Sequence, residues 1–376
     1  FKQKTAYEIM PSLVGSEMCI RDRHRGGNPM RKGAFIWIVI TLITMLSAIS
    51  SGGGIASQSP ESILKGAYKA EDTLQVHGIK ETIATLPKGT VKVRVELWQS
   101  NGKRLQIYLA GPLVGDKVLE MKGDVYYISP KLRRVTVTHP PIVPNSAIDL
   151  MLRNYRVERA GEDLIAERRC VILWIKPVHR GNPSRKVWID SETLFPLRKE
   201  SYNSNGELES VSMFTEIEYA PDIPEGLFKL PEGWMTVERP GFKPIDLDRD
   251  LSSELGFKPI LLKNLPEGYV LSGAFINAAA PGPLLQVKYT DGMNQISLFE
   301  RIKVRGRGMG MGWMRGRGRR MMGRKMMWGR KACMMFEDIG VQAGRAVMVP
   351  HPRLLITIVG DVSEEIMRHI VEENFR

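Results

Sequence analysis

Apolar and polar residues alternate with a period of two over much of this chain, and that pattern limits the fold to sheet with one buried face. Residues 91–97 alternate Val and Leu with Lys, Arg and Glu, and residues 105–109 alternate in the same way. Asn101-Gly102 lies between the two runs, and Asn-Gly in that position is a strong signal of a two-residue β-hairpin. The sequence therefore predicts paired antiparallel strands that bury one face and expose the other.

The same rhythm continues to residue 219, with little helix to cover it. A helix is predicted over 60–73, because Ser59 supplies an N-cap and Pro60 suits the first helical position. A short helix is predicted over 146–154. Further strands are predicted on both sides of Lys122-Gly123-Asp124 and over 133–138, 155–159, 167–175, 186–190, 197–202 and 209–219. Many strands with two short helices predict a mostly β (α+β) fold, a curved sheet or open half-barrel that encloses an apolar cavity.

The alternating runs also indicate which side chains line that cavity. We predict that the odd-numbered residues of both hairpin strands face one side and that the short helix covers them. The candidate ligand-binding residues are Val93, Val95, Leu97, Ile107, Leu109, Leu150 and Met151.

The length suits two domains preceded by segments that do not belong to the fold. Residues 1–29 lack an initiating Met and apolar periodicity, which indicates a non-native leader. Residues 30–56 carry basic residues, an apolar run and then small residues, as an export signal does, with an uncleaved membrane anchor as the alternative. We predict a first domain over 57–237, a Pro- and Gly-rich linker over 238–258, and a smaller α+β domain over 259–376 that carries an insert at 305–331. The body of the protein is expected to lie outside the cytoplasm.

Most of the net charge of +13 comes from one segment. Residues 305–331 hold eight Arg, two Lys and no acid, a charge of +10, and residues 1–32 add +4, which leaves −1 for the rest of the chain. Because a nucleic-acid footprint spreads over a folded face, this distribution argues against nucleic acid as a partner. The insert is built of Gly, Arg, Lys, Met and Trp, which is typical of a low-complexity spacer. Contact with anionic membrane lipid and a thioether Cu(I) site remain its alternative functions.

Signatures of catalysis and of metal binding are missing from the sequence. No Gly-x-Ser-x-Gly, His-Glu-x-x-His or phosphate-binding loop is present, and the histidines are isolated. Asp190 and Glu192 fall in a turn between strands, where Asp is favoured for its geometry. Cys170 and Cys333 are able to pair in an oxidising compartment, although a buried thiol and an exposed one is the simpler interpretation. We therefore expect a binding protein without a cofactor rather than an enzyme.

An ordered set of segments resembles the MucB/RseB family. In the first domain the set comprises the helix 60–73, the Asn101-Gly102 hairpin, 154–157, 188–190 with Thr193, 196–200, Asn205-Gly206 and 227–234; in the second it comprises 265–269, 289–300 and 358–362. The first domain of that family is similar to the lipoprotein carrier LolA. The resemblance implies a half-barrel that binds lipid acyl chains, and a second domain that helps to dock the periplasmic part of an anti-sigma factor. It thereby implies regulation of sigma-E in the envelope stress response, with a periplasmic carrier or chaperone of lipoproteins or lipids as the alternative. The insert departs from the family pattern.

Overall fold

A computed structural model describes residues 55–86, 89–140, 147–239, 241–278, 282–303 and 345–375. The predicted leader, nearly all of the export segment, the insert 305–331 and Cys333 lie outside the described residues. Within these ranges, no helix combines the length and the apolar character needed to cross a bilayer.

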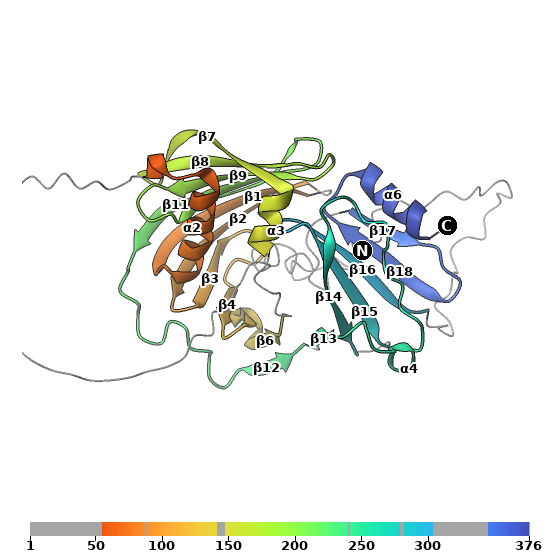
Figure 1. Cartoon of the computed structure of the whole chain (residues 1–376). Helices are drawn as coiled ribbons and strands as arrows, with labels where there is room; N and C mark the ends of the chain where they lie inside the picture. The colour runs from red at the N-terminus through yellow and green to blue at the C-terminus, as the bar shows by residue number, and fades with distance from the viewer. Residues whose placement is uncertain are drawn as a thin grey trace, which may run out of the picture.

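The first domain is one large open sheet (Figure 1). Its strands are β1 (Val76–Leu86), β2 (Gly89–Ser100), β3 (Lys103–Ala110), β4 (Lys117–Met121), β5 (Asp124–Ser129), β6 (Arg134–Thr138), β7 (Tyr155–Ile165), β8 (Arg168–Pro177), β9 (Ser184–Asp190), β10 (Pro196–Tyr202), β11 (Leu208–Tyr219) and β12 (Met235–Glu238). They lie in the order β12-β6-β5-β4-β3-β2-β1-β11-β10-β9-β8-β7, and every neighbouring pair is antiparallel except β12 with β6. The predicted mostly β fold, an open sheet covered by helices, is confirmed.

Two helices lie against one face of this sheet, which we call the inner face (Figure 1). Helix α2 (Pro60–Thr73) begins where predicted, because the Ser59 hydroxyl accepts a hydrogen bond from the amide of Ser62. Its buried side, which includes Ile63 and Leu64, packs on β7, β8 and β9. Helix α3 (Ala147–Asn154) packs beside it, with Met151 completely buried in the same cluster. The helices thus fill one half of the curved sheet and leave the other half, around β1 to β4, incompletely covered.

The opposite face, which we call the outer face, is also apolar between β2 and β6. Leu105, Leu119 and Ile128 are buried there together with Val135 and Val137. Residues 227–234, Leu-Phe-Lys-Leu-Pro-Glu-Gly-Trp, cross over this face and pack against the cluster. We call them the cover segment. A sheet that is normally wet on its second face is therefore partly sandwiched here.

The second domain is a smaller sheet with one long helix. It comprises β13 (Lys243–Ile245), α4 (Ser252–Leu255), β14 (Val270–Asn277), β15 (Leu284–Thr290), β16 (Gln295–Ile302), β17 (Arg345–Val349), β18 (Leu354–Gly360) and α6 (Glu364–Asn374). The sheet order is β13-β14-β15-β16-β18-β17, and the core lies between this sheet and α6. Ser363 caps α6 by accepting a hydrogen bond from the amide of Ile366.

Part of the predicted linker belongs to this second domain. Strand β13 pairs with β14, and Leu251 and Leu255 are buried in the core of the second domain. The Pro, Gly and Asp content of 238–258 suggests a linker, but the apolar residues Leu251 and Leu255 within it pack into the core of the second domain. The segment assigned to the linker is therefore too long at its C-terminal end.

Candidate ligand-binding cavity

A cavity of about 210 Å³ lies between α2 and the inner face of the large sheet. Its apolar wall includes Leu64, Ala67 and Tyr68 from α2, which the helical spacing places on one side of the helix. Val93 and Val95 of β2 face them across the cavity. The cavity lies where the two helices leave the curved sheet incompletely covered.

Polar side chains form much of the remaining lining, so the cavity is only partly apolar, whereas the sequence predicts an apolar one. The central strands contribute Thr82 and Ser212, whose hydroxyl oxygens lie 3.0 Å apart. Lys199 also lines the cavity and pairs with Glu71 of α2 at 2.8 Å. Other charged or amide side chains in the lining are Lys80, Asp72, Gln99, Arg104, Gln106, Glu120 and Arg185. The cavity is therefore amphipathic, with a mainly apolar helix and β2 side and a polar floor on β1, β10 and β11.

Tyr68 marks the boundary between these two sides. Burial raises the pKa of its hydroxyl, although the neighbouring Arg185 and Lys199 favour the ionised form. Its hydroxyl lies 3.6 Å from the sulfur of Met151. Tyr68 thus remains neutral at physiological pH and connects the cavity to the core under α3.

The structure divides the predicted cavity residues into two sets. Val93 and Val95 line the cavity, but Ile107 and Leu109 belong to the outer face, and 40% of Leu109 is exposed. In the hairpin, Val95 pairs with Tyr108 and Glu96 pairs with Ile107. A two-residue turn at 101–102 pairs odd with even positions, so the inner face continues on β3 through even-numbered residues. The prediction that one parity holds on both strands is wrong for this reason.

The other predicted residues are buried near the cavity but not in its wall. Leu97 packs in a separate cluster with Phe195 and Phe214, beside a smaller hollow. Leu150 and Met151 are buried on α3, and neither lines the cavity. Gln106 and Tyr108 line the cavity but were not predicted, although the register of the Asn101-Gly102 hairpin places both of them on the inner face.

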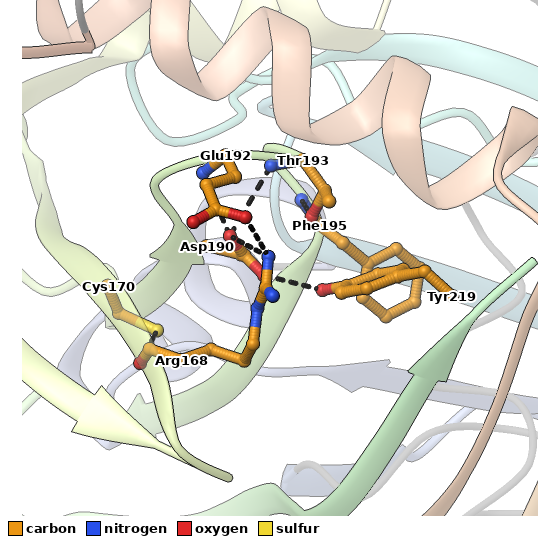
Figure 2. A network of polar contacts seen from close by, with 7 residues as sticks. All are labelled: Arg168, Cys170, Asp190, Glu192, Thr193, Phe195 and Tyr219. Carbon is orange, nitrogen blue, oxygen red and sulfur yellow. Dashed lines mark hydrogen bonds and ion pairs between the residues drawn. The ribbon is translucent and has the colours of Figure 1, made fainter.

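Asp190 lies at the centre of a structural network rather than a catalytic one (Figure 2). The carboxylate is 1% exposed and accepts from Arg168 Nε at 2.8 Å, from the Tyr219 hydroxyl at 2.8 Å and from the amides of Glu192 and Thr193. Burial alone would raise the pKa of Asp190, but these hydrogen bonds outweigh it and hold the pKa below its ordinary value. All its neighbours are fixed within the turn and the adjoining strands, so the Trp-Ile-Asp motif secures the β9–β10 corner.

Cys170 lies next to this network and is inert. It is completely buried, and burial together with the charge of Asp190 raises the pKa of its thiol to about 12. No cluster of His, Cys, Asp or Glu with metal-binding proximity occurs in the described part of the chain.

A second buried polar network joins the two domains. Asp291, at the β15–β16 turn, is completely buried, and its Oδ2 accepts from the Tyr155 hydroxyl at 2.5 Å and from Asn182 Nδ2 at 3.2 Å. Asn294 Nδ2 donates to the same oxygen at 3.1 Å, and Asn154 Nδ2 donates to the Asp291 carbonyl at 2.8 Å. Burial, followed by the charge of Asp291, raises the pKa of Tyr155, which therefore remains a neutral donor. We call this network the domain junction.

These features define the class of the protein: a two-domain, mostly β protein whose open sheet carries a cavity under a helix. Residues 102–231 match the family described as MucB/RseB N-terminal domain. This part of the chain is therefore similar to the MucB/RseB N-terminal domain, in agreement with the resemblance noted in the sequence. No match occurs among curated protein sequences.

Solved structures extend the likeness to both domains. The MucA/MucB complex of Pseudomonas aeruginosa matches with a TM-score of 0.54 and 15% identity, over 83% of this chain and 96% of that chain. A crystal structure of MucB with MucA(peri) matches with a TM-score of 0.52 and 14% identity, over 83% of this chain and 97% of that chain. A LolA superfamily protein from Nitrosomonas europaea matches at 13% identity with a TM-score of 0.25, over 46% of this chain and 98% of that chain. The two MucB matches show that the fold of both domains is shared.

Proposed function

We propose that this protein is a periplasmic regulator that binds the periplasmic part of a membrane anti-sigma factor in the envelope stress response. One observation carries the proposal: the likeness to MucB spans 83% of this chain and includes both domains, and the matching MucB structures contain MucA. The domain junction supports a regulator in which both domains act as one unit, because it holds them together through Asp291.

The cavity is the proposed site for a lipid acyl chain. Leu64, Val93 and Val95 supply apolar surface, and each buried methylene contributes about 0.8 kcal/mol. The volume of about 210 Å³ is below the range of roughly 300–1,000 Å³ of sites for whole drug-sized ligands, so the cavity accommodates part of a chain. The polar floor suits the more polar end of the same molecule. The proposed ligand is therefore an amphiphile, either a free lipid or the lipid of a lipoprotein.

The proposal assigns no catalytic step to the chain. Asp190 does not line the cavity, and its carboxylate accepts hydrogen bonds from Arg168 and from an amide of its own turn. The insert 305–331 is proposed as a contact for anionic membrane lipid, to which each surface charge contributes up to about 1 kcal/mol.

Capture by the immobilised full chain tests the regulator function. The probes are the periplasmic domain of Pseudomonas aeruginosa MucA and that of an anti-sigma factor from the same genome as this chain. We expect retention of the anti-sigma domain and no retention of an unrelated periplasmic domain. Transfer of a lipoprotein without retention of either anti-sigma domain would instead identify a carrier.

A further inference from the structure

A second cavity, of about 200 Å³, lies on the outer face of the large sheet under the cover segment. Leu105, Leu119 and Ile128 form its base, and Leu227 and Trp234 contribute to its cover. These base residues belong to neighbouring strands, because Leu105 pairs with Leu119 in the β3–β4 ladder. The sheet itself separates this outer cavity from the amphipathic cavity on the inner face.

The outer cavity has two ammonium groups in an otherwise apolar lining. Lys117 pairs directly with Ile128 across β4 and β5, so both side chains point to the outer face. Lys229 reaches the cavity from the cover segment. None of the ion pairs among the described residues involves Lys117 or Lys229. The neighbouring Asp116 is occupied elsewhere, since it accepts from Ser129 at 2.8 Å and from the Tyr127 hydroxyl.

The chemistry of this lining selects an acyl chain over a peptide. Apart from the two ammonium groups and the indole of Trp234, no side chain in the lining donates or accepts hydrogen bonds. A peptide backbone in such a cavity would bury amide groups without partners, which is costly, whereas a hydrocarbon chain has none to satisfy. The ammonium groups favour a negative charge on the ligand.

The volume sets the length of chain that fits. An engineered apolar cavity of about 150 Å³ binds benzene, so a cavity of about 200 Å³ accommodates roughly six to eight carbons. We propose that the outer cavity is a second ligand site, which binds a medium-chain fatty acid with its carboxylate between Lys117 and Lys229. This site is independent of the proposed anti-sigma interaction, and either proposal can fail without the other.

Titration of the full chain with sodium octanoate and with 1-octanol tests the assignment. Trp234 lines the outer cavity, and the inner cavity has no Trp in its lining. We expect octanoate to change the tryptophan fluorescence in a saturable way, and Trp234→Phe to abolish that change. A response that persists in Trp234→Phe would place the ligand elsewhere and overturn the proposal, as would the absence of saturable binding.

Two variants then separate charge from shape. Lys117→Gln with Lys229→Gln is expected to raise the Kd of octanoate about tenfold and to leave that of 1-octanol within twofold, since two partly exposed ion pairs are removed. Ile128→Phe fills the cavity and is expected to weaken both ligands at least tenfold. The matched control is Lys69→Gln with Lys122→Gln, which removes two exposed lysines outside the lining.

Unchanged octanoate affinity in the Lys117→Gln, Lys229→Gln protein would overturn the carboxylate assignment. This double variant changes only partly exposed or exposed residues, so it remains informative if Ile128→Phe fails to fold.

Discussion

Removal of one hydroxyl group is expected to loosen the connection between the two domains. Tyr155 begins β7 and is 3% exposed, and its hydroxyl donates to Asp291 Oδ2 and accepts from Asn294 Nδ2, each at 2.5 Å. Tyr155→Phe retains the ring, which packs in the core under α2, and deletes only these two bonds. The variant therefore tests the junction without opening a cavity in the first domain.

The expected magnitude follows from the groups that remain. A hydrogen bond to a charged group contributes about 1.5–3 kcal/mol. Asp291 Oδ2 retains Asn182 Nδ2 and Asn294 Nδ2 as donors, so the carboxylate is not left without partners. We therefore expect Tyr155→Phe to lower the free energy of unfolding by about 2 kcal/mol.

A double-mutant cycle measured by urea unfolding isolates this contribution. Asp291→Ala alone also disturbs its own turn, since Asp291 Oδ1 accepts from the amides of Met293 and Asn294 at 2.9 and 2.6 Å. The cycle of Tyr155→Phe with Asp291→Ala cancels that effect, and we expect a coupling energy of about 2 kcal/mol.

The matched control is Tyr202→Phe, whose hydroxyl donates to Glu200 within the first domain. In combination with Asp291→Ala it should be additive to within about 0.5 kcal/mol. A coupling energy for Tyr155 no larger than that of Tyr202 would refute the junction.

Three further predictions concern the cavity and two buried carboxyl groups. Val95→Asp buries a carboxylate in the cavity wall and should abolish binding of a fluorescent acyl probe or unfold the first domain. Leu109→Asp, on the outer face and 40% exposed, should leave probe binding unchanged. Equal effects of the two substitutions would contradict the assignment of these residues to opposite faces. Burial raises the pKa of Glu300 to about 8, although a hydrogen bond from the amide of Ile260 opposes the shift. The stability that Glu300 contributes when protonated is complete below about pH 4.5 and is lost as the pH rises through about 8. Glu300→Gln should therefore stabilise the protein at pH 9 by up to about 5 kcal/mol. The same substitution should flatten the pH dependence of thermal unfolding. Arg168→Met leaves the buried carboxylate of Asp190 without its cation and should cost about 3 kcal/mol at pH 7; a loss below 1 kcal/mol by chemical denaturation would show that the network of Figure 2 is dispensable.

The sequence predicts the strands of clean alternation well and misses one that is irregular. The predicted segments from 91 to 219 correspond to β2–β11, and α2 begins at the predicted Pro60. β1 was not predicted, because its inward-facing even-numbered positions include Lys80 and Thr82 as well as Val76 and Ala84, so apolar and polar residues do not alternate along it. The strand nevertheless keeps a period of two, since Val76 and Ala84 are buried while Ile83, on the other face, is 41% exposed.

The candidate site was partly predictable, and the reason for the error is geometric. Val93 and Val95 follow from periodicity alone, and the turn at 101–102 contains enough information to add Gln106 and Tyr108. The polar floor could not be predicted from local patterns, because β1 and β11 are far apart in the sequence and meet only through strand pairing. The domain junction is still harder to predict from the sequence, since Tyr155 and Asp291 are 136 residues apart and no local pattern connects them.

Calorimetric titration of the full chain with the periplasmic domain of an anti-sigma factor from the same genome tests the central claim most directly. The proposed function predicts saturable binding with a stoichiometry near one. It also predicts weaker binding by Tyr155→Phe, because the two domains bind as one unit, and unchanged binding by the matched Tyr202→Phe. Absence of binding by the folded full chain would contradict the assignment as an anti-sigma regulator.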